Sequence, residues 1–342
     1  MTKFPRTFRR VAVLGDGGWG TALALLLHEN GASVTLWSAF ADYAAVLKRT
    51  RRNPKFLPGV RLPAGMRITA DIGEALAGAD LLLSVIPTQH VRGVWRKAAP
   101  HWRGVPVCSA TKGLEMGTLK RPSEILRELL GAKAPLAVLS GPSIAGEVAR
   151  GLPAAVVVAA RSRPLAARLQ HTFHSRRFRV YTSADVVGVE LGGALKNVIA
   201  LAAGMCDGLG LGSNAKAALL TRGVLEMSTL GVSLGAHPET FFGLSGVGDL
   251  ITTSLSSEGR NRSVGEALGR GRTLKQILGG TPQVIEGVWS SEAVVAFARA
   301  RGVDVPISRQ VRDVCFRGKS PRAALAALMG RSARPEGAVP GR

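Results

Sequence analysis

The feature that most constrains the fold is a glycine turn close to the N-terminus. A short apolar run, Val11–Leu14, ends at Gly15, Gly17 and Gly20, which match the pattern G-x-G-x-x-G, and residues 21–30 then have the composition of an apolar helix. The first glycine allows the tight turn, the second lets the backbone approach a pyrophosphate, and the third lets helix and strand pack closely. A purely structural glycine turn shows the same spacing, but the flanking strand and helix favour a site for NAD or NADP.

Further apolar runs of strand length alternate with helix-like segments through the first half of the chain. They are residues 33–37, 80–86, 105–110, 136–140 and 154–160. This alternation predicts a parallel sheet covered by helices on both faces.

The pattern changes after about Asp185, where strand-like runs stop and Ala/Leu/Gly segments with helical spacing continue to about Arg331. We therefore expect an α/β fold: a Rossmann-like, doubly wound N-terminal domain over residues 1–187, followed by an all-helical C-terminal domain over residues 188–331. Residues 332–342 have two prolines, two glycines and little to bury, and are predicted to form a disordered tail.

The charge balance points to anionic ligands. The chain has 45 Lys and Arg against 23 Asp and Glu, a formal charge of +22, which attracts phosphates, nucleic acid or acidic lipid surfaces. The basic residues are spread along the chain without a helix-turn-helix or RNA-recognition pattern. We therefore expect no specific nucleic-acid partner, although a basic nucleic-acid-binding protein remains the alternative from a different functional class.

The cysteines and the apolar runs indicate a reducing, cytoplasmic compartment. Cys108, Cys206 and Cys315 are far apart and lack metal-ligand spacing, so neither a disulfide framework nor a metal site is expected. No run reaches the roughly 20 apolar residues that a membrane span needs. The expected setting is cytoplasmic, without a membrane span.

The end of the second predicted strand does not distinguish the two cofactors. NAD-binding domains usually place an acid there for the ribose hydroxyls, whereas an Arg accommodates a 2′-phosphate. In this chain Trp37, Ser38, Ala39 and Phe40 provide neither, and the first acid is Asp42.

Several motifs, in this order along the chain, carry a family resemblance. They are Gly15–Thr21, Asn53–Pro58, Ser109–Glu115, Leu139–Val148, Glu190–Val198, Gly246–Thr253, Gly259–Arg262 and Val284–Gly287. By these motifs the chain resembles the soluble bacterial NAD(P)-dependent glycerol-3-phosphate dehydrogenases over nearly its whole length. The resemblance implies interconversion of dihydroxyacetone phosphate and sn-glycerol 3-phosphate with NAD or NADP, which supplies the glycerophosphate backbone of phospholipids. It also makes a homodimer possible.

The resemblance implies roles for particular residues. Lys196 matches the catalytic lysine, with Lys112 and Asp249 as its active-site partners. Substrate contacts fall on Lys112, Lys196, Asp249, Gly141, Ser143, Thr253, Gly259, Arg260 and Asn261. Matching cofactor contacts are Gly18, Trp19, Ala145, Val284 and Glu286. The expected cofactor contacts also include the motif glycines Gly15, Gly17 and Gly20, together with Phe40, Lys112 and Arg260. No residue is assigned to a metal.

Two departures from the family pattern bear on the cofactor. Gly18 stands where many members have Ser, and we expect a small effect because the backbone N–H is kept. Ala39 and Phe40 stand where NADP-using members commonly carry His or Arg, so the usual clamp on the 2′-phosphate is missing. Phe40 is a hypothetical stacking partner for the adenine.

The chemistry of ketone reduction fits Lys196. Hydride transfer builds negative charge on the carbonyl oxygen, which needs a cationic or proton-donating group close by. On a helix over about residues 188–205, Gly192, Gly193 and Ala200 flank Lys196, and we expect these small residues to leave room for a ligand. Lys112 is a candidate for the neighbouring cation that lowers the lysine pKa. In so basic a chain the alternative is a solvated surface lysine.

The remaining candidates each have a structural alternative. Asp249 is either a plain helix N-cap or the partner that orients Lys196. The run Gly259–Arg262 suits a phosphate clamp but also fits an ordinary basic loop. Within enzymes, the competing hypothesis is another two-domain dehydrogenase acting on a hydroxy acid.

Overall fold

The computed structural model describes residues 7–279, 284–333 and 335–336. It divides into two compact units, of which the first comprises residues 1–111 and 122–186 and the second residues 112–121 and 187–342. Residues 112–121 lie within the range predicted for the first domain, but they pack with the helical unit.

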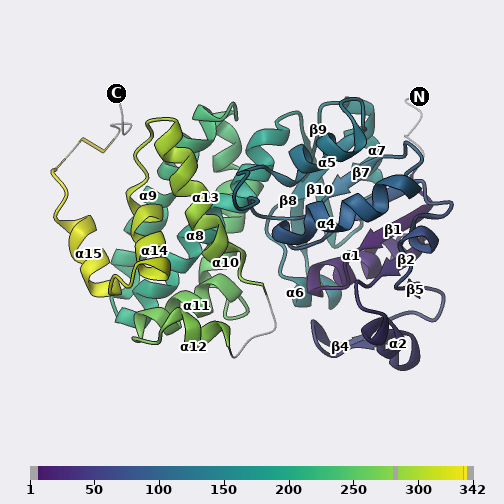
Figure 1. Cartoon of the computed structure of the whole chain (residues 1–342), viewed down its shortest axis with the longest axis horizontal. Coiled ribbons are helices and arrows are strands. Elements are labelled where there is room, and N and C mark those ends of the chain that lie inside the picture. Colours follow the sequence, from purple (N-terminus) through teal and green to yellow (C-terminus); the bar gives the residue numbers. More distant parts are fainter. Residues whose placement is uncertain (1–6, 280–283, 334, 337–342) are drawn as a thin grey trace. The chain divides into compact units, whose positions relative to one another are not determined.

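The first unit is built on an eight-stranded sheet in the order β10-β9-β8-β7-β6-β1-β2-β5 (Figure 1). The strands are β1 Arg10–Leu14, β2 Ser33–Trp37, β5 Arg67–Thr69, β6 Leu81–Ser84, β7 Val107–Ser109, β8 Leu136–Ser140, β9 Ala154–Ala160 and β10 Phe178–Ser183. A separate hairpin pairs β3 Arg52–Asn53 with β4 Leu57–Arg61. Helices connect the strands: α1 Gly18–Glu29, α2 Ala41–Thr50, α3 Ile72–Leu76, α4 Thr88–Ala98, η1 Ala99–His101, α5 Pro122–Leu130, α6 Ala145–Ala149 and α7 Arg163–Phe173. The Rossmann-like α/β fold is thus confirmed for this unit.

The short apolar runs become strands because both faces of the sheet are buried. Along β1, Val11 and Val13 join the core cluster that includes α1 and α7, whereas Ala12 and Leu14 join the cluster that includes α3, α4 and α5. Since successive side chains of a strand point to opposite faces, burial on both sides requires a continuous apolar run.

One part of the predicted sheet is wrong. β8 and β9 pair antiparallel, while every other pairing in the eight-stranded sheet is parallel. The short α6 and the turn after it return the chain beside β8 in the opposite direction, whereas a parallel neighbour needs a longer crossover. The strands β5 and β10 were not predicted from the sequence, because their burial patterns are mixed.

The second unit is all helical in its described residues (Figure 1). Its helices are α8 Val186–Leu209, α9 Gly212–Ser233, η2 Pro238–Phe242, η3 Leu244–Gly248, α10 Asp249–Leu255, α11 Arg260–Gly269, α12 Leu274–Leu278, α13 Glu286–Ala300, α14 Pro306–Phe316 and α15 Pro321–Met329. In the described part of the chain, α8 is the one helix long and apolar enough to cross a membrane, and 94% of its most apolar window is buried inside the fold. It is the core helix of this unit.

Glycines allow α8 and α11 to approach closely. A Cβ added at Gly204 would lie 2.0 Å from the Arg262 carbonyl oxygen. A Cβ added at Gly208 would lie 2.2 Å from the Glu266 carbonyl oxygen. On the facing helix, a Cβ at Gly265 would lie 2.0 Å from the Leu201 oxygen. Glycines four residues apart therefore let the two backbones touch, and α11 is placed directly against the helix that carries Lys196.

The C-terminal segment is described only in part. Arg222 donates to the Glu336 carbonyl oxygen at 3.2 Å. Residues 334 and 337–342 of the predicted disordered tail lie outside the described residues.

Candidate active site

The glycine turn after β1 has an accessible backbone. Gly15 has a φ of +122°, a conformation that side chains rarely adopt, and a Cβ at Gly20 would lie 2.0 Å from the Gly15 carbonyl oxygen. A Cβ at Gly17 would meet no atom within 4 Å, so this position faces open space. The turn lies beside β1, where the sheet order places β6 on one side and β2 on the other, which is where α/β folds bind dinucleotides. These features fit a pyrophosphate at the N-terminus of α1.

The neighbours of this turn bear on two expectations. A Cβ at Gly18 would lie 2.7 Å from the Phe56 carbonyl oxygen, so the chain packs against this position. That the missing Ser hydroxyl has a small effect on cofactor binding stays a prediction. Trp19 has a buried indole N–H without a partner in the described residues. Phe40 is 63% exposed, which leaves its ring accessible for stacking.

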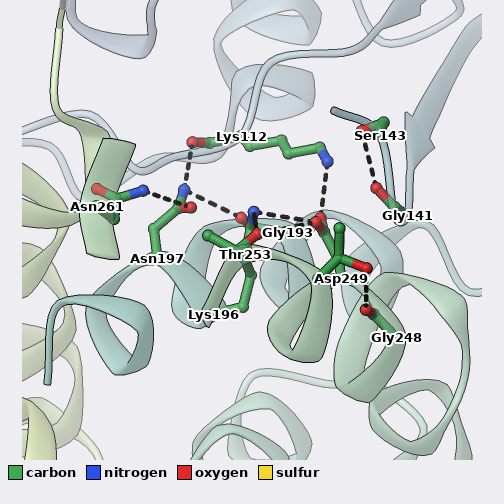
Figure 2. A network of polar contacts seen from close by, with 11 residues as sticks. Lys112, Gly141, Ser143, Gly193, Lys196, Asn197, Gly248, Asp249, Thr253 and Asn261 are labelled. Carbon is green, nitrogen blue, oxygen red and sulfur yellow. Dashed lines mark hydrogen bonds and ion pairs between the residues drawn. The ribbon is translucent and has the colours of Figure 1, made fainter. Parts of the chain in front are cut away.

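The loop after β8 holds three predicted contact residues of the first unit. Gly141 has a φ of +135°, and the Ser143 hydroxyl donates to its carbonyl oxygen at 2.8 Å (Figure 2). Ala145 begins α6, and its Cβ lies 3.5 Å from the position of a Cβ on Gly18. The structure thus brings Ala145 close to the glycine turn.

Lys196, Lys112 and Asp249 form a buried charged cluster in the second unit (Figure 2). The Lys196 Nζ lies 3.0 Å from Asp249 Oδ1, and the Lys112 Nζ lies 2.7 Å from Asp249 Oδ2. Lys196 also donates to the Thr253 hydroxyl, which donates in turn to Asp249. Lys196 is 6% exposed, which excludes the solvated surface lysine.

The surroundings of Lys196 shift its pKa towards neutral pH. Desolvation by burial lowers the pKa of Lys196, the charge of Asp249 opposes this, and the charge of Lys112 adds to it, so the pKa lies at about 8. Burial raises the pKa of Asp249, but the two lysines outweigh that effect and hold it below its usual value. Asp249 therefore stays ionised, while Lys196 can exchange a proton near neutral pH.

One local expectation needs correction, and one alternative is excluded. The small residues flanking Lys196 serve packing at Gly192, where a Cβ would lie 2.6 Å from the Ser245 carbonyl oxygen, so no ligand space opens there. Asp249 is not the N-cap of α10, since Gly248 holds that position and the Asp249 carboxylate accepts from the lysines instead.

The start of α11 carries the predicted phosphate-binding residues. Gly259 is its N-cap, and Arg260 is exposed, donating to the Val284 carbonyl oxygen at 3.4 Å. Glu286, predicted to contact the cofactor, begins α13. Asn261 is buried: its Nδ2 donates to Asn197 and its Oδ1 accepts from the Gly287 N–H, so much of its amide is used within the protein.

Asn197 is a site residue that sequence reasoning missed. Its amide donates to the carbonyl oxygens of Lys112 and Gly193, and its Oδ1 accepts from Asn261. It therefore ties together the segment that carries Lys112, helix α8 and the start of α11. Its place next to Lys196 in the sequence was the available signal.

Segment 112–121 has a second anchor that the sequence did not reveal. Arg121 forms an ion pair with Glu190 of α8 at 2.8 Å, and the Glu190 side chain is fully buried. Both ends of the segment are thus fixed to the helical unit.

Within residues 7–279, 284–333 and 335–336, no group of three or more His, Cys, Asp or Glu side chains has the arrangement of a metal site.

Together, an α/β unit with an accessible glycine turn and a helical unit with a buried lysine pair on one carboxylate define the class of two-domain nicotinamide-dependent dehydrogenases. The model of the NAD-dependent glycerol-3-phosphate dehydrogenase N-terminus matches residues 10–166, and that of the C-terminus matches residues 185–326. The chain belongs to this family, as the resemblance predicted, and is an oxidoreductase whose cofactor is NAD or NADP.

Individual relatives agree. The chain is 47% identical over 331 residues to glycerol-3-phosphate dehydrogenase (NAD(P)+) of Streptomyces griseus, covering 96% of this chain and 98% of the relative. It is 48% identical over 328 residues to glycerol-3-phosphate dehydrogenase (NAD(P)+) 2 of Mycobacterium tuberculosis, covering 95% of this chain and 98% of the relative. The solved structure of the Coxiella burnetii glycerol-3-phosphate dehydrogenase has a TM-score of 0.91 at 38% identity, covering 95% and 99%.

More distant structures share the fold alone. A D-mandelate dehydrogenase solved with NADH and anilino(oxo)acetate has a TM-score of 0.60 at 14% identity. This likeness carries no argument for a hydroxy-acid substrate.

Proposed function

We propose that this chain catalyses the interconversion of dihydroxyacetone phosphate and sn-glycerol 3-phosphate with Lys196 as the acid and base, supplying glycerol 3-phosphate for phospholipid synthesis. The observation that carries the catalytic assignment is the buried ion pair of Lys196 with Asp249, reinforced by Lys112 on the same carboxylate.

The proposed cofactor site of the first unit uses Gly15, Gly17, Gly18, Trp19, Gly20, Phe40 and Ala145. The open space at Gly17 and the N-terminus of α1 suit a pyrophosphate. When bound, the nicotinamide supplies or accepts the hydride. From the second unit we propose Lys112, Arg260, Val284 and Glu286 as further contacts.

Lys196 is proposed to handle the proton. In the reducing direction, its ammonium stabilises the negative charge that develops on the carbonyl oxygen and donates a proton from Nζ to it. In the oxidising direction, the neutral amine accepts the hydroxyl proton. Asp249 orients Nζ by a charge-assisted hydrogen bond, and a pKa at about 8 makes both protonation states accessible.

The start of α11 is proposed to hold the substrate phosphate. The first N–H groups of an α-helix have no acceptor within the helix, and they and the helix dipole favour an anion. Gly259 places no side-chain cap over them, and the guanidinium of Arg260 is exposed beside them. Asn261 is proposed to contribute its remaining amide N–H, and Thr253, Gly141 and Ser143 to contact the rest of the substrate.

We further propose a cytoplasmic location and a homodimer, without a specific nucleic-acid partner. Analytical ultracentrifugation of the purified protein tests the dimer directly.

The test of the proposed function is the oxidation of NADH and NADPH by purified protein with dihydroxyacetone phosphate. We expect Lys196→Ala to lower kcat by about 10²–10⁴-fold, the usual contribution of a general acid. The control is Lys275→Ala on the exposed side of α12, which is expected to keep full activity. No oxidation by the unmodified protein, or equal activity of Lys196→Ala, would contradict the proposal.

A further inference from the structure

The residue between the first two glycines of the turn is an aspartate, and its side chain reaches the end of β2. The Ser38 hydroxyl donates to Asp16 Oδ2 at 2.6 Å, and Ser38 follows β2 directly. Both side chains belong to the first unit, where Ser38 is fully buried and Asp16 is 8% exposed. A carboxylate from the β1 turn thus occupies the tip of the second strand.

The backbone of Asp16 is held firmly in this position. Its carbonyl oxygen accepts from the Asn53 amide at 2.7 Å and from the Thr21 hydroxyl at 3.1 Å. Asn53 also donates to Thr21, so the three residues form a closed network at the start of α1. The backbone from which the carboxylate projects is therefore fixed.

The carboxylate retains capacity to accept further hydrogen bonds. Ser38 is the only side chain that donates to it in the described part of the chain. Burial raises the pKa of Asp16 above its usual value, and the Ser38 hydrogen bond and the charge of Lys55 offset only part of this rise. An ionised carboxylate has about four acceptor positions.

The tip of the second strand is where dinucleotide-binding domains select their cofactor. An acid there accepts from the ribose 2′-hydroxyl of NAD, whereas a base accommodates the 2′-phosphate of NADP. In this chain Ala39 and Phe40 carry no charge. The end of β2 is instead joined to a carboxylate, that of Asp16, through the Ser38 hydroxyl.

From this geometry we infer that Asp16 takes the place of the missing acid at the end of β2 and makes the chain select NAD(H) over NADP(H). It would accept from the adenosine ribose hydroxyls of NAD(H) and repel a 2′-phosphate. The inference rests on the proposed cofactor site around Gly17.

Binding without substrate tests this inference separately from activity. NADH and NADPH are titrated by their fluorescence at pH 7.5 against the unmodified protein, Asp16→Asn and Asp42→Asn. Asp42 is the matched control, because it is an exposed acid in the first turn of α2 and its loss changes the net charge equally. Circular dichroism checks folding, and Asp16→Ser replaces the Asn variant if that variant does not fold.

We expect the unmodified protein to bind NADH at least about tenfold more tightly than NADPH, since specificity arises from repulsion as well as attraction. Asp16→Asn should reduce that ratio at least about fivefold, mainly by tightening NADPH, and Asp42→Asn should leave it unchanged. Equal or tighter binding of NADPH by the unmodified protein would overturn the inference, as would an unchanged ratio in the Asp16 variants or an equal change in Asp42→Asn. Failure to bind either cofactor would overturn the proposed cofactor site as well.

Discussion

At the residue scale, the site depends on one buried carboxylate shared by two lysines. Removing charges from water is expensive, and a buried charge persists only when it is paired and hydrogen-bonded. Asp249 pairs with Lys112 through one oxygen and with Lys196 through the other, and Thr253 adds a hydroxyl. The net positive charge of this cluster suits an anionic substrate.

Arg260 offers a sharp test of how the phosphate is held. Arg260→Ala should raise KM for dihydroxyacetone phosphate by about 10–100-fold with little change in kcat, because a hydrogen bond to a charged group contributes about 1.5–3 kcal/mol. Steady-state kinetics measures both constants. Arg270→Ala is the control, since Arg270 is exposed and pairs with Glu266 just beyond the end of α11. An equal loss of activity towards unphosphorylated dihydroxyacetone would contradict the assignment.

At the element scale, the position of α11 depends on glycine contacts with α8. Gly265 and Gly204 bring each helix against the backbone of the other, and Gly208 continues the contact one turn further. The residues at the start of α11 therefore keep their place relative to Lys196 by backbone packing, together with the Asn261–Asn197 hydrogen bond.

Replacing one of these glycines should affect stability and substrate affinity together. In Gly265→Ala the Cβ would lie 2.0 Å from the Leu201 oxygen, so we expect a loss of roughly 1–3 kcal/mol in the free energy of unfolding and a melting temperature lower by roughly 2–10 °C. KM for dihydroxyacetone phosphate should rise in the same variant because Arg260 moves with α11.

The control is Gly93→Ala, at an exposed position of α4 where a Cβ meets nothing within 4 Å. This variant should gain about 0.5–1 kcal/mol, since glycine is the poorer helix former. Thermal unfolding compares the two variants. A Gly265→Ala protein as stable as the unmodified chain would show that the helices do not need this contact.

Strand prediction succeeded where burial alone determines the pattern and failed where pairing does. The continuous apolar run of β1 identifies a strand buried on both faces. The antiparallel direction of β9 is set by its pairing with β8, which a local run of residues does not show. The strand β10 has exposed residues among its buried ones, so it lacks the continuous apolar run that identifies β1. The close crossing of α8 and α11 also needs two distant segments to be considered together.

At the scale of the whole molecule, the chain separates into a unit with the glycine turn and a unit with the charged cluster. Lys112, Lys196 and Asp249 could be identified because they lie in motifs that carry the family resemblance. They did not reveal that Asn197 connects three segments, that Gly192 serves packing, or that Asp16 reaches Ser38, because each of these contacts joins residues that the fold brings together.

The central claim is that Lys196, the proposed acid and base, has a pKa that burial lowers and Asp249 raises, and the most direct test is the pH dependence of kcat in both directions. Reduction needs protonated Lys196 and should fall as pH rises through about 8, while oxidation needs the neutral amine and should rise over the same range. Because Asp249 raises the pKa of Lys196, Asp249→Asn should move both midpoints to lower pH by about 1 unit or more. Values of kcat that do not change between about pH 6.5 and about 9.5 would contradict the account, as would a midpoint that is the same in Asp249→Asn as in the unmodified protein.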